Sequence, residues 1–136
     1  MDNKIKHLEF IQQTISRMAS NSFFLKGWAV TLVVGVLAFA NVKDMDEKYI
    51  IIALIPTIVF WFLDGFYLHQ EKLFRELYDD IRKIKSDEDI DFSMNTKPYI
   101  NDIDTWAKVC GSRTLSLFYI PIIVVIILAV WVFPIL

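Results

Sequence analysis

Residues that interrupt helices or cross-link chains are scarce in this sequence. Its 136 residues include four glycines, four prolines and one cysteine, and the net charge is −2. The lone Cys110 excludes an intramolecular disulfide, and the scattered glycines exclude a glycine-rich phosphate-binding loop. Without a basic excess, duplex DNA binding is not expected. HExxH, CxxC and GxSxG motifs and paired catalytic carboxylates are also missing, so we expect no enzyme activity, metal site or cofactor.

Apolar residues are abundant and are separated from the charged ones. Hydrophobic residues make up 55% of the chain and the mean hydropathy is +0.44, although 14 basic and 16 acidic residues remain. Three apolar segments, at 22–41, 49–68 and 114–136, each reach the roughly 20 residues that a helix needs to cross a bilayer. The sequence therefore predicts an all-α membrane protein with three transmembrane helices, of which the first two form a hairpin over 22–68.

The other segments also have helical patterns. Apolar residues recur every three or four positions between Ile5 and Met18, which predicts an amphipathic helix over 1–21. No glycine or proline occurs in 66–85, so the second helix is expected to run for about 35 residues from Tyr49 and to leave the membrane as a stalk.

The region 69–113, which follows the second span, begins with this stalk and contains an acidic loop at 86–100. After the loop, Asn101 is expected to cap a helix that continues into the third span at 114–136. The third span has no polar residue after Tyr119, so we expect it to face lipid.

The distribution of basic residues predicts the orientation of the chain. Twelve of the 14 Lys and Arg residues lie in 1–26 and 69–113, whereas only Lys43 and Lys48 lie between the first two spans. Because basic residues are retained on the cytoplasmic side, the N terminus and the 69–113 region are predicted to be cytoplasmic. Three spans then place the C terminus on the outer side.

Two charged residues interrupt the apolar segments, Lys26 in the first and Asp64 in the second. If the hairpin turns near Met45, each lies 19 residues from the turn, so the two share one depth. A charge in hydrocarbon costs at least about 2.5 kcal/mol, which favours positions that are paired or face water. Two interpretations follow. The residues are structural, as a salt bridge or as side chains that snorkel to the interface, or they form an ion or gating site at the inner mouth of a pore.

Small and polar residues line one side of the first span. They recur at helical spacing and permit either close helix packing or the lining of a narrow pore. Thr57 lies with Asp64 on a comparable face of the second span. The residues on the first span are Gly27, Thr31, Gly35 and Ala38.

Aromatic and basic residues recur in the region before the third span. Such residues suit a nucleotide through stacking and phosphate contacts, whereas a solvated helix with Trp106 packed on the stalk explains the same pattern. His7 and His69 have no sequence partners that indicate a metal and are expected to hydrogen-bond locally at the membrane edge. The candidate ligand residues are Lys97, Tyr99, Trp106, Lys108 and Arg113.

Two stretches carry a resemblance to a known group of proteins. The first is SRMASNSFFLKGW (16–28), which leads into the hairpin, and the second is FWFLDGFYLHQEKLFRELYDDIR (60–82), which leaves it. Over residues 1–85 the arrangement resembles the small helical, SLATT-like membrane effectors of bacterial anti-phage systems, many of which have only two spans. The resemblance implies a homo-oligomer in the bacterial inner membrane that opens a pore or perturbs the bilayer, triggered by a nucleotide or oligonucleotide signal or a signalling protein.

Chain length independently favours self-association. Three spans are too few to enclose a hydrated path, and copies of one chain usually assemble as closed rings. We therefore expect a regulated homo-oligomeric pore whose partners are the lipid bilayer and the chain itself. The alternative is a membrane anchor or accessory subunit whose stalk recruits a cytosolic partner.

Overall fold

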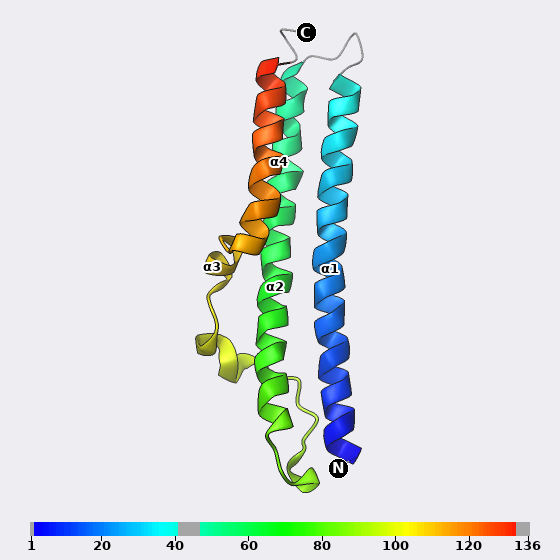
Figure 1. Ribbon diagram of the computed structural model, residues 1–136, viewed down its shortest axis with the longest axis vertical. Coiled ribbons are helices and arrows are strands. Elements are labelled where there is room, and N and C mark those ends of the chain that lie inside the picture. The colour runs from blue at the N-terminus through cyan, green and yellow to red at the C-terminus, as the bar shows by residue number, and fades with distance from the viewer. Residues whose placement is uncertain (1, 41–46, 133–136) are drawn as a thin grey trace.

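Every regular element in the described part of the chain is helical, as predicted. The computed structural model describes residues 2–40 and 47–132. Figure 1 shows a long antiparallel pair, α1 and α2, with α4 lying along the first half of α2. In chain order the elements are α1 (Asp2–Ala40), η1 (Glu47–Ala53), α2 (Leu54–Arg82), η2 (Asp87–Asp89), η3 (Lys97–Asp102), α3 (Trp106–Cys110) and α4 (Arg113–Val132).

The first helix, α1, is a single helix of 39 residues. The sequence had predicted an amphipathic helix over 1–21 and a separate span from residue 22, but that boundary falls inside α1. The two are continuous because no glycine or proline precedes Gly27 to break the ladder of backbone hydrogen bonds. At 1.5 Å per residue, α1 is about 58 Å long, roughly twice the thickness of a bilayer core.

The second long helix begins with a 3₁₀ segment, which the sequence analysis had not predicted. A 3₁₀ helix, Glu47–Ala53, leads directly into α2, so the helical stretch expected from Tyr49 is confirmed but opens in 3₁₀ geometry. Pro56 lies in the first turn of α2, where its fixed φ is compatible with helical geometry. The predicted turn near Met45 and the predicted end of the third span at 133–136 lie outside the described residues.

Three apolar clusters hold the helices together along the length of the molecule. One lies at the end of the hairpin that carries the N terminus, one lies midway, and one lies where α1 ends and α2 begins (Figure 1). Their buried members are, respectively, Ile11, Ile15, Leu77, Ile81 and Ile90; Ala29, Val109, Leu115 and Tyr119; and Val33, Ile50, Ala53, Ile126 and Ala129.

The connection between α2 and α4 differs from the predicted single helix. Asn101 lies inside η3 and does not cap a helix that reaches the third span. Thr105 is the N-cap instead: its backbone is extended, and its hydroxyl oxygen accepts a hydrogen bond from the N–H of Lys108 at 3.4 Å. This helix, α3, ends at Cys110 with Gly111 as its C-cap, and α4 starts afresh at Arg113.

Three helical stretches are long and apolar enough to cross a membrane: α1, Tyr49–Arg82 and α4. These three candidates contain the three apolar segments that the sequence analysis predicted as spans. Large apolar side chains on their outward faces are exposed, including Phe23, Phe62 and Leu128. A hydrocarbon environment suits such surfaces, and their extent supports a membrane location. The expectation that the third span faces lipid holds for only one side of α4, because Leu115 and Ile126 are fully buried on the other.

Candidate functional site: a buried ion pair shared by three helices

The predicted contact between Lys26 on α1 and Asp64 on α2 is confirmed. The ammonium nitrogen of Lys26 lies 2.5 Å from Oδ2 of Asp64. The carboxylate is completely buried, whereas the Lys26 side chain is 21% exposed. The antiparallel packing of α1 and α2 brings the two residues to one level, which is the relationship that their equal spacing from Met45 predicted.

Two further side chains bind the same carboxylate. The hydroxyl of Ser22, one turn before Lys26 on α1, donates to Oδ1 of Asp64 and accepts a hydrogen bond from the Lys26 ammonium at 2.8 Å. From α4, the Tyr119 hydroxyl donates to Oδ2 at 2.9 Å. Asp64 therefore receives hydrogen bonds from all three residues, which satisfies the charge that burial would otherwise make costly.

Sequence reasoning missed Ser22 and Tyr119 as members of this site. Ser22 stands four residues before Lys26, on the same helical face, and that spacing was a usable signal. Nothing in the sequence linked Tyr119 to Asp64, because 55 residues separate them and only the docking of α4 brings them together.

Aromatic contacts fix α4 and α3 around the ion pair. The rings of Trp61 and Tyr119 are stacked, with centroids 5.7 Å apart and an interplanar angle of 5°. The indole N–H of Trp61 donates to the backbone carbonyl of Cys110 at 2.7 Å. The Lys26 ammonium also lies 5.8 Å from the ring centroid of Phe118. The site thus joins all three candidate spans and the short helix α3.

Close packing at Gly65 seats α3 against α2. A Cβ atom at this position would meet Sγ of Cys110, and it would lie 3.4 Å from the indole nitrogen of Trp106. The indole N–H of Trp106 donates a hydrogen bond to the backbone carbonyl of Phe62 at 3.1 Å, which also holds α3 on α2. Glycine at 65 therefore leaves room for the Cys110 side chain, which would have to shift if residue 65 carried a Cβ atom.

Comparisons with protein-family models, curated proteins and solved structures find no match to this chain. The geometry of the chain itself therefore carries the functional inference. A fully bonded, buried carboxylate with an ammonium partner can hold three helices in register. Separation of α1 from α2 would also separate these charges, so the ion pair opposes it.

The other predicted pore or hairpin residues lie in different environments. Thr57 is buried between the helices, and its hydroxyl donates to the Ala53 carbonyl at 2.7 Å. Thr31 is exposed on α1 and donates to the Gly27 carbonyl at 2.8 Å. Gly35 is partly buried, and a Cβ atom added there would meet nothing within 4 Å. Of the predicted set, only Lys26 and Asp64 contact each other through their side chains.

The predicted ligand residues do not come together. Tyr99 packs on the cluster at the N-terminal end of α1, whereas the Trp106 indole bonds to Phe62. Burial, with a hydrogen bond and the charge of Asp80, raises the pKa of Tyr99 to about 12. Phe62 and Asp80 lie 18 positions apart on α2, which is about 27 Å along the helix. Trp106 therefore packs on α2, as the alternative interpretation had it, and Lys97, Lys108 and Arg113 are exposed.

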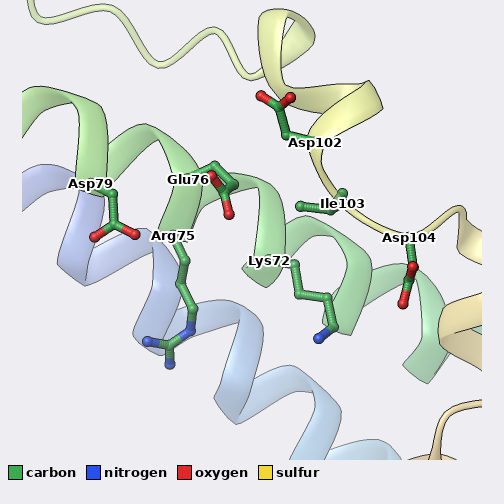
Figure 2. A pocket seen from close by; sticks show the side chains of 7 residues that line it. All are labelled: Lys72, Arg75, Glu76, Asp79, Asp102, Ile103 and Asp104. Atoms are coloured by element: carbon green, nitrogen blue, oxygen red, sulfur yellow. The ribbon is translucent and has the colours of Figure 1, made fainter.

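A charged cleft of about 460 Å³ lies instead between α2 and the connection to α3. Figure 2 shows its side chains, which come from α2 and from residues 102–104. Four carboxylates outnumber two basic groups, so the cleft does not match the phosphate-binding chemistry that was predicted. The residues that line it are Lys72, Arg75, Glu76, Asp79, Asp102, Ile103 and Asp104.

Proposed function

We propose that this protein is a homo-oligomeric membrane pore whose wall is formed by α1. The observation that supports this most directly is the uncovered face of α1. Gly27 and Thr31 are exposed, and nothing lies within 4 Å of a Cβ atom added at Gly27 or Gly35. The chain's own helices cover the opposite side, where Ala29 and Val33 are buried.

The other two spans offer no comparable face in the described residues. On α2 the polar Thr57 and Asp64 point inward and are buried. On α4 the exposed residues beyond Tyr119 are Ile, Val and Leu, apart from Pro121 and Trp131. A ring of chains with α1 innermost would present the small and polar face to the lumen or to a neighbouring α1, and the apolar faces of α2 and α4 to lipid.

The Lys26–Asp64 pair acts in this proposal as a lock on each subunit. It holds α1 against α2 and α4 on the side of α1 that faces away from the proposed lumen. The carboxylate is fully buried, so in this state it keeps α1 in register and does not itself contact ions. As a pore, the protein carries out no covalent chemistry.

The cellular setting is proposed from the charge distribution and the resemblance. The basic residues favour a cytoplasmic N terminus and an outer C terminus, and the SLATT-like arrangement favours the bacterial inner membrane and a role in anti-phage defence. The trigger is then a nucleotide or oligonucleotide signal or a signalling protein that acts on the cytoplasmic half of the hairpin.

The proposal is tested by ion flux into liposomes that contain the purified full-length chain. In a Cys110→Ala background, Thr31→Cys should make the flux sensitive to a membrane-impermeant, charged thiol reagent. Leu128→Cys is the matched control, because this residue is 54% exposed on the outward side of α4. Equal reagent sensitivity at both positions, or no flux from oligomeric protein under any condition, would reject the pore.

The alternative, an anchor or accessory subunit, has one structural feature in its favour. The half of the hairpin that carries the N terminus has its own apolar core, and the charged cleft lies beside it. If the protein is an anchor, this half of the hairpin should retain a cytosolic protein at the membrane, and liposomes that contain the chain should show no flux. Lys72→Glu, within the cleft, should then release that protein without changing membrane insertion.

A further inference from the structure

The segment that follows α2 crosses back over the N-terminal end of α1. Asp87, in η2, accepts hydrogen bonds from the backbone N–H groups of Asn3 and Lys4, at 3.2 and 2.9 Å. These groups belong to the first turn of α1 and have no acceptor within the helix. A residue 84 positions from Asn3 therefore caps α1.

A second attachment involves a histidine that the sequence placed at the membrane edge. His7 lies near the end of the hairpin that carries the N terminus, and its side chain is completely buried. Its Nε2 atom lies 2.8 Å from the backbone carbonyl oxygen of Ser93. Its Nδ1 is buried and has no hydrogen-bond partner among the described residues. Between the two attachments, Ile90 enters the apolar cluster that contains Ile11.

The segment between these attachments contains a strained residue. Phe92 has a φ of 56°, and it is the only non-glycine residue with positive φ in the described part of the chain. An aromatic residue rarely adopts this left-handed conformation unless its surroundings impose it. Here it places the ring 5.5 Å from that of His7 and 6.1 Å from that of Phe10.

The core of the hairpin does not depend on this segment alone. Ile11 and Ile15 of α1 share their cluster with Leu77 and Ile81 of α2, so the two helices remain packed if residues 86–93 move away. The attachment through Asp87 is solvent-accessible, and the backbone N–H of Lys4 lowers the pKa of its carboxyl group. The segment is therefore held by a few polar bonds and two apolar side chains, Ile90 and Phe92, against local strain.

We propose that residues 86–93 form a clasp that closes over the N-terminal end of α1 and opens as a unit of its own, without separation of α1 from α2. The strain at Phe92 and the unpaired nitrogen of His7 both lower the free-energy cost of opening. Because α1 is continuous from Asp2 to Ala40, one helix connects the clasp to Lys26. In the proposed pore, an open clasp leaves α1 free to move and so promotes conduction. This last step rests on the proposed function.

Amide hydrogen exchange of the full-length chain in detergent tests the clasp without reference to conduction. Asp87→Ala should raise the exchange rates of Asn3 and Lys4 about five-fold, the usual effect of losing a helix cap. The amides of residues 8–15 should be unchanged. Glu88→Ala, at the exposed neighbouring position, is the control. If residues 3–4 and 8–15 always exchange as one cooperative unit, the clasp is overturned.

A pair of substitutions at Phe92 tests the strain. Phe92→Gly and Phe92→Ala both remove the ring, but only glycine adopts a positive φ without steric cost. The alanine variant should therefore open roughly five-fold more often than the glycine variant. Equal exchange rates in these two variants would contradict stored strain at this position.

Liposome flux separates the clasp from the pore. Asp87→Ala should conduct more than wild type and more than Glu88→Ala. If wild type conducts and Asp87→Ala conducts equally, the gating role is rejected and the pore stands. If no variant conducts, the proposed function is rejected, and the exchange experiment alone decides whether the clasp exists.

Discussion

Tyr119 on α4 donates its hydroxyl hydrogen to Oδ2 of Asp64 on α2 at 2.9 Å, and both side chains are completely buried. The same oxygen lies 2.5 Å from the ammonium of Lys26 on α1. One carboxylate oxygen therefore contacts a side chain from each of the other two candidate spans. In an apolar environment no water replaces a lost bond, so the position of α4 depends on the charge pair of the hairpin.

Removing one partner of the ion pair should destabilise the chain far more than removing both. Asp64→Leu leaves the Lys26 ammonium without its counter-ion and should lower the free energy of unfolding by about 3–5 kcal/mol. Lys26→Met combined with Asp64→Leu should recover most of this loss, because no charge is left buried. Equilibrium unfolding in detergent micelles measures both. A double variant as unstable as Asp64→Leu would contradict pairing as the main contribution.

The hydroxyl of Tyr119 can be removed without removing its ring. Tyr119→Phe keeps the stacking on Trp61 and loses the hydrogen bond to Asp64, which should cost about 1–3 kcal/mol of unfolding free energy. Tyr49→Phe is the control, because Tyr49 is 55% exposed. Equal unfolding curves for the two variants would show that the bond to Asp64 adds nothing.

The packing of α3 on α2 should be sensitive to one methyl group. Gly65→Ala places a Cβ atom against Sγ of Cys110 and should cost about 1–3 kcal/mol through overpacking. Cys110→Ala in the same chain should relieve much of that cost. Gly27→Ala should instead be neutral or stabilising, since nothing lies within 4 Å of the added atom and alanine favours helix. Thermal unfolding in detergent ranks the three variants.

Tyr99 should make the chain less stable at high pH. Burial is the main reason that the pKa of Tyr99 in the folded chain is raised to about 12 from its ordinary value of 10.0, so ionisation is favoured in the unfolded chain. Its contribution is therefore fully present below pH 10 and is lost as pH rises toward 12. Tyr99→Phe should flatten the pH dependence of unfolding in this window. An unchanged slope in that variant would exclude Tyr99 as its source.

The sequence predicted the Lys26–Asp64 contact because hydrocarbon penalises lone charges and a hairpin equalises depth. It failed at the connection between α2 and α4. The residue type of Asn101 favoured it as the cap, but Asn101 lies inside η3, and the N-cap of α3 is Thr105, which has an extended backbone. The prediction of a nucleotide site from residues 97–113 was wrong for a similar reason. The spacing of these residues along the chain does not indicate which turn of α2 each of them packs against.

The sequence by itself determined that the chain is helical, that it has three apolar segments, and that Lys26 and Asp64 lie at one depth. These properties follow from composition and helical periodicity, which depend only on residues close together in the chain. The tertiary structure alone decided that Tyr119 completes the site at Asp64, that Asp87 caps α1 and that Gly65 receives Cys110. Each of these contacts joins segments tens of residues apart. Their partners depend on how α4 and the 83–105 connection dock on the hairpin, and docking depends on side-chain shape, which no local pattern encodes.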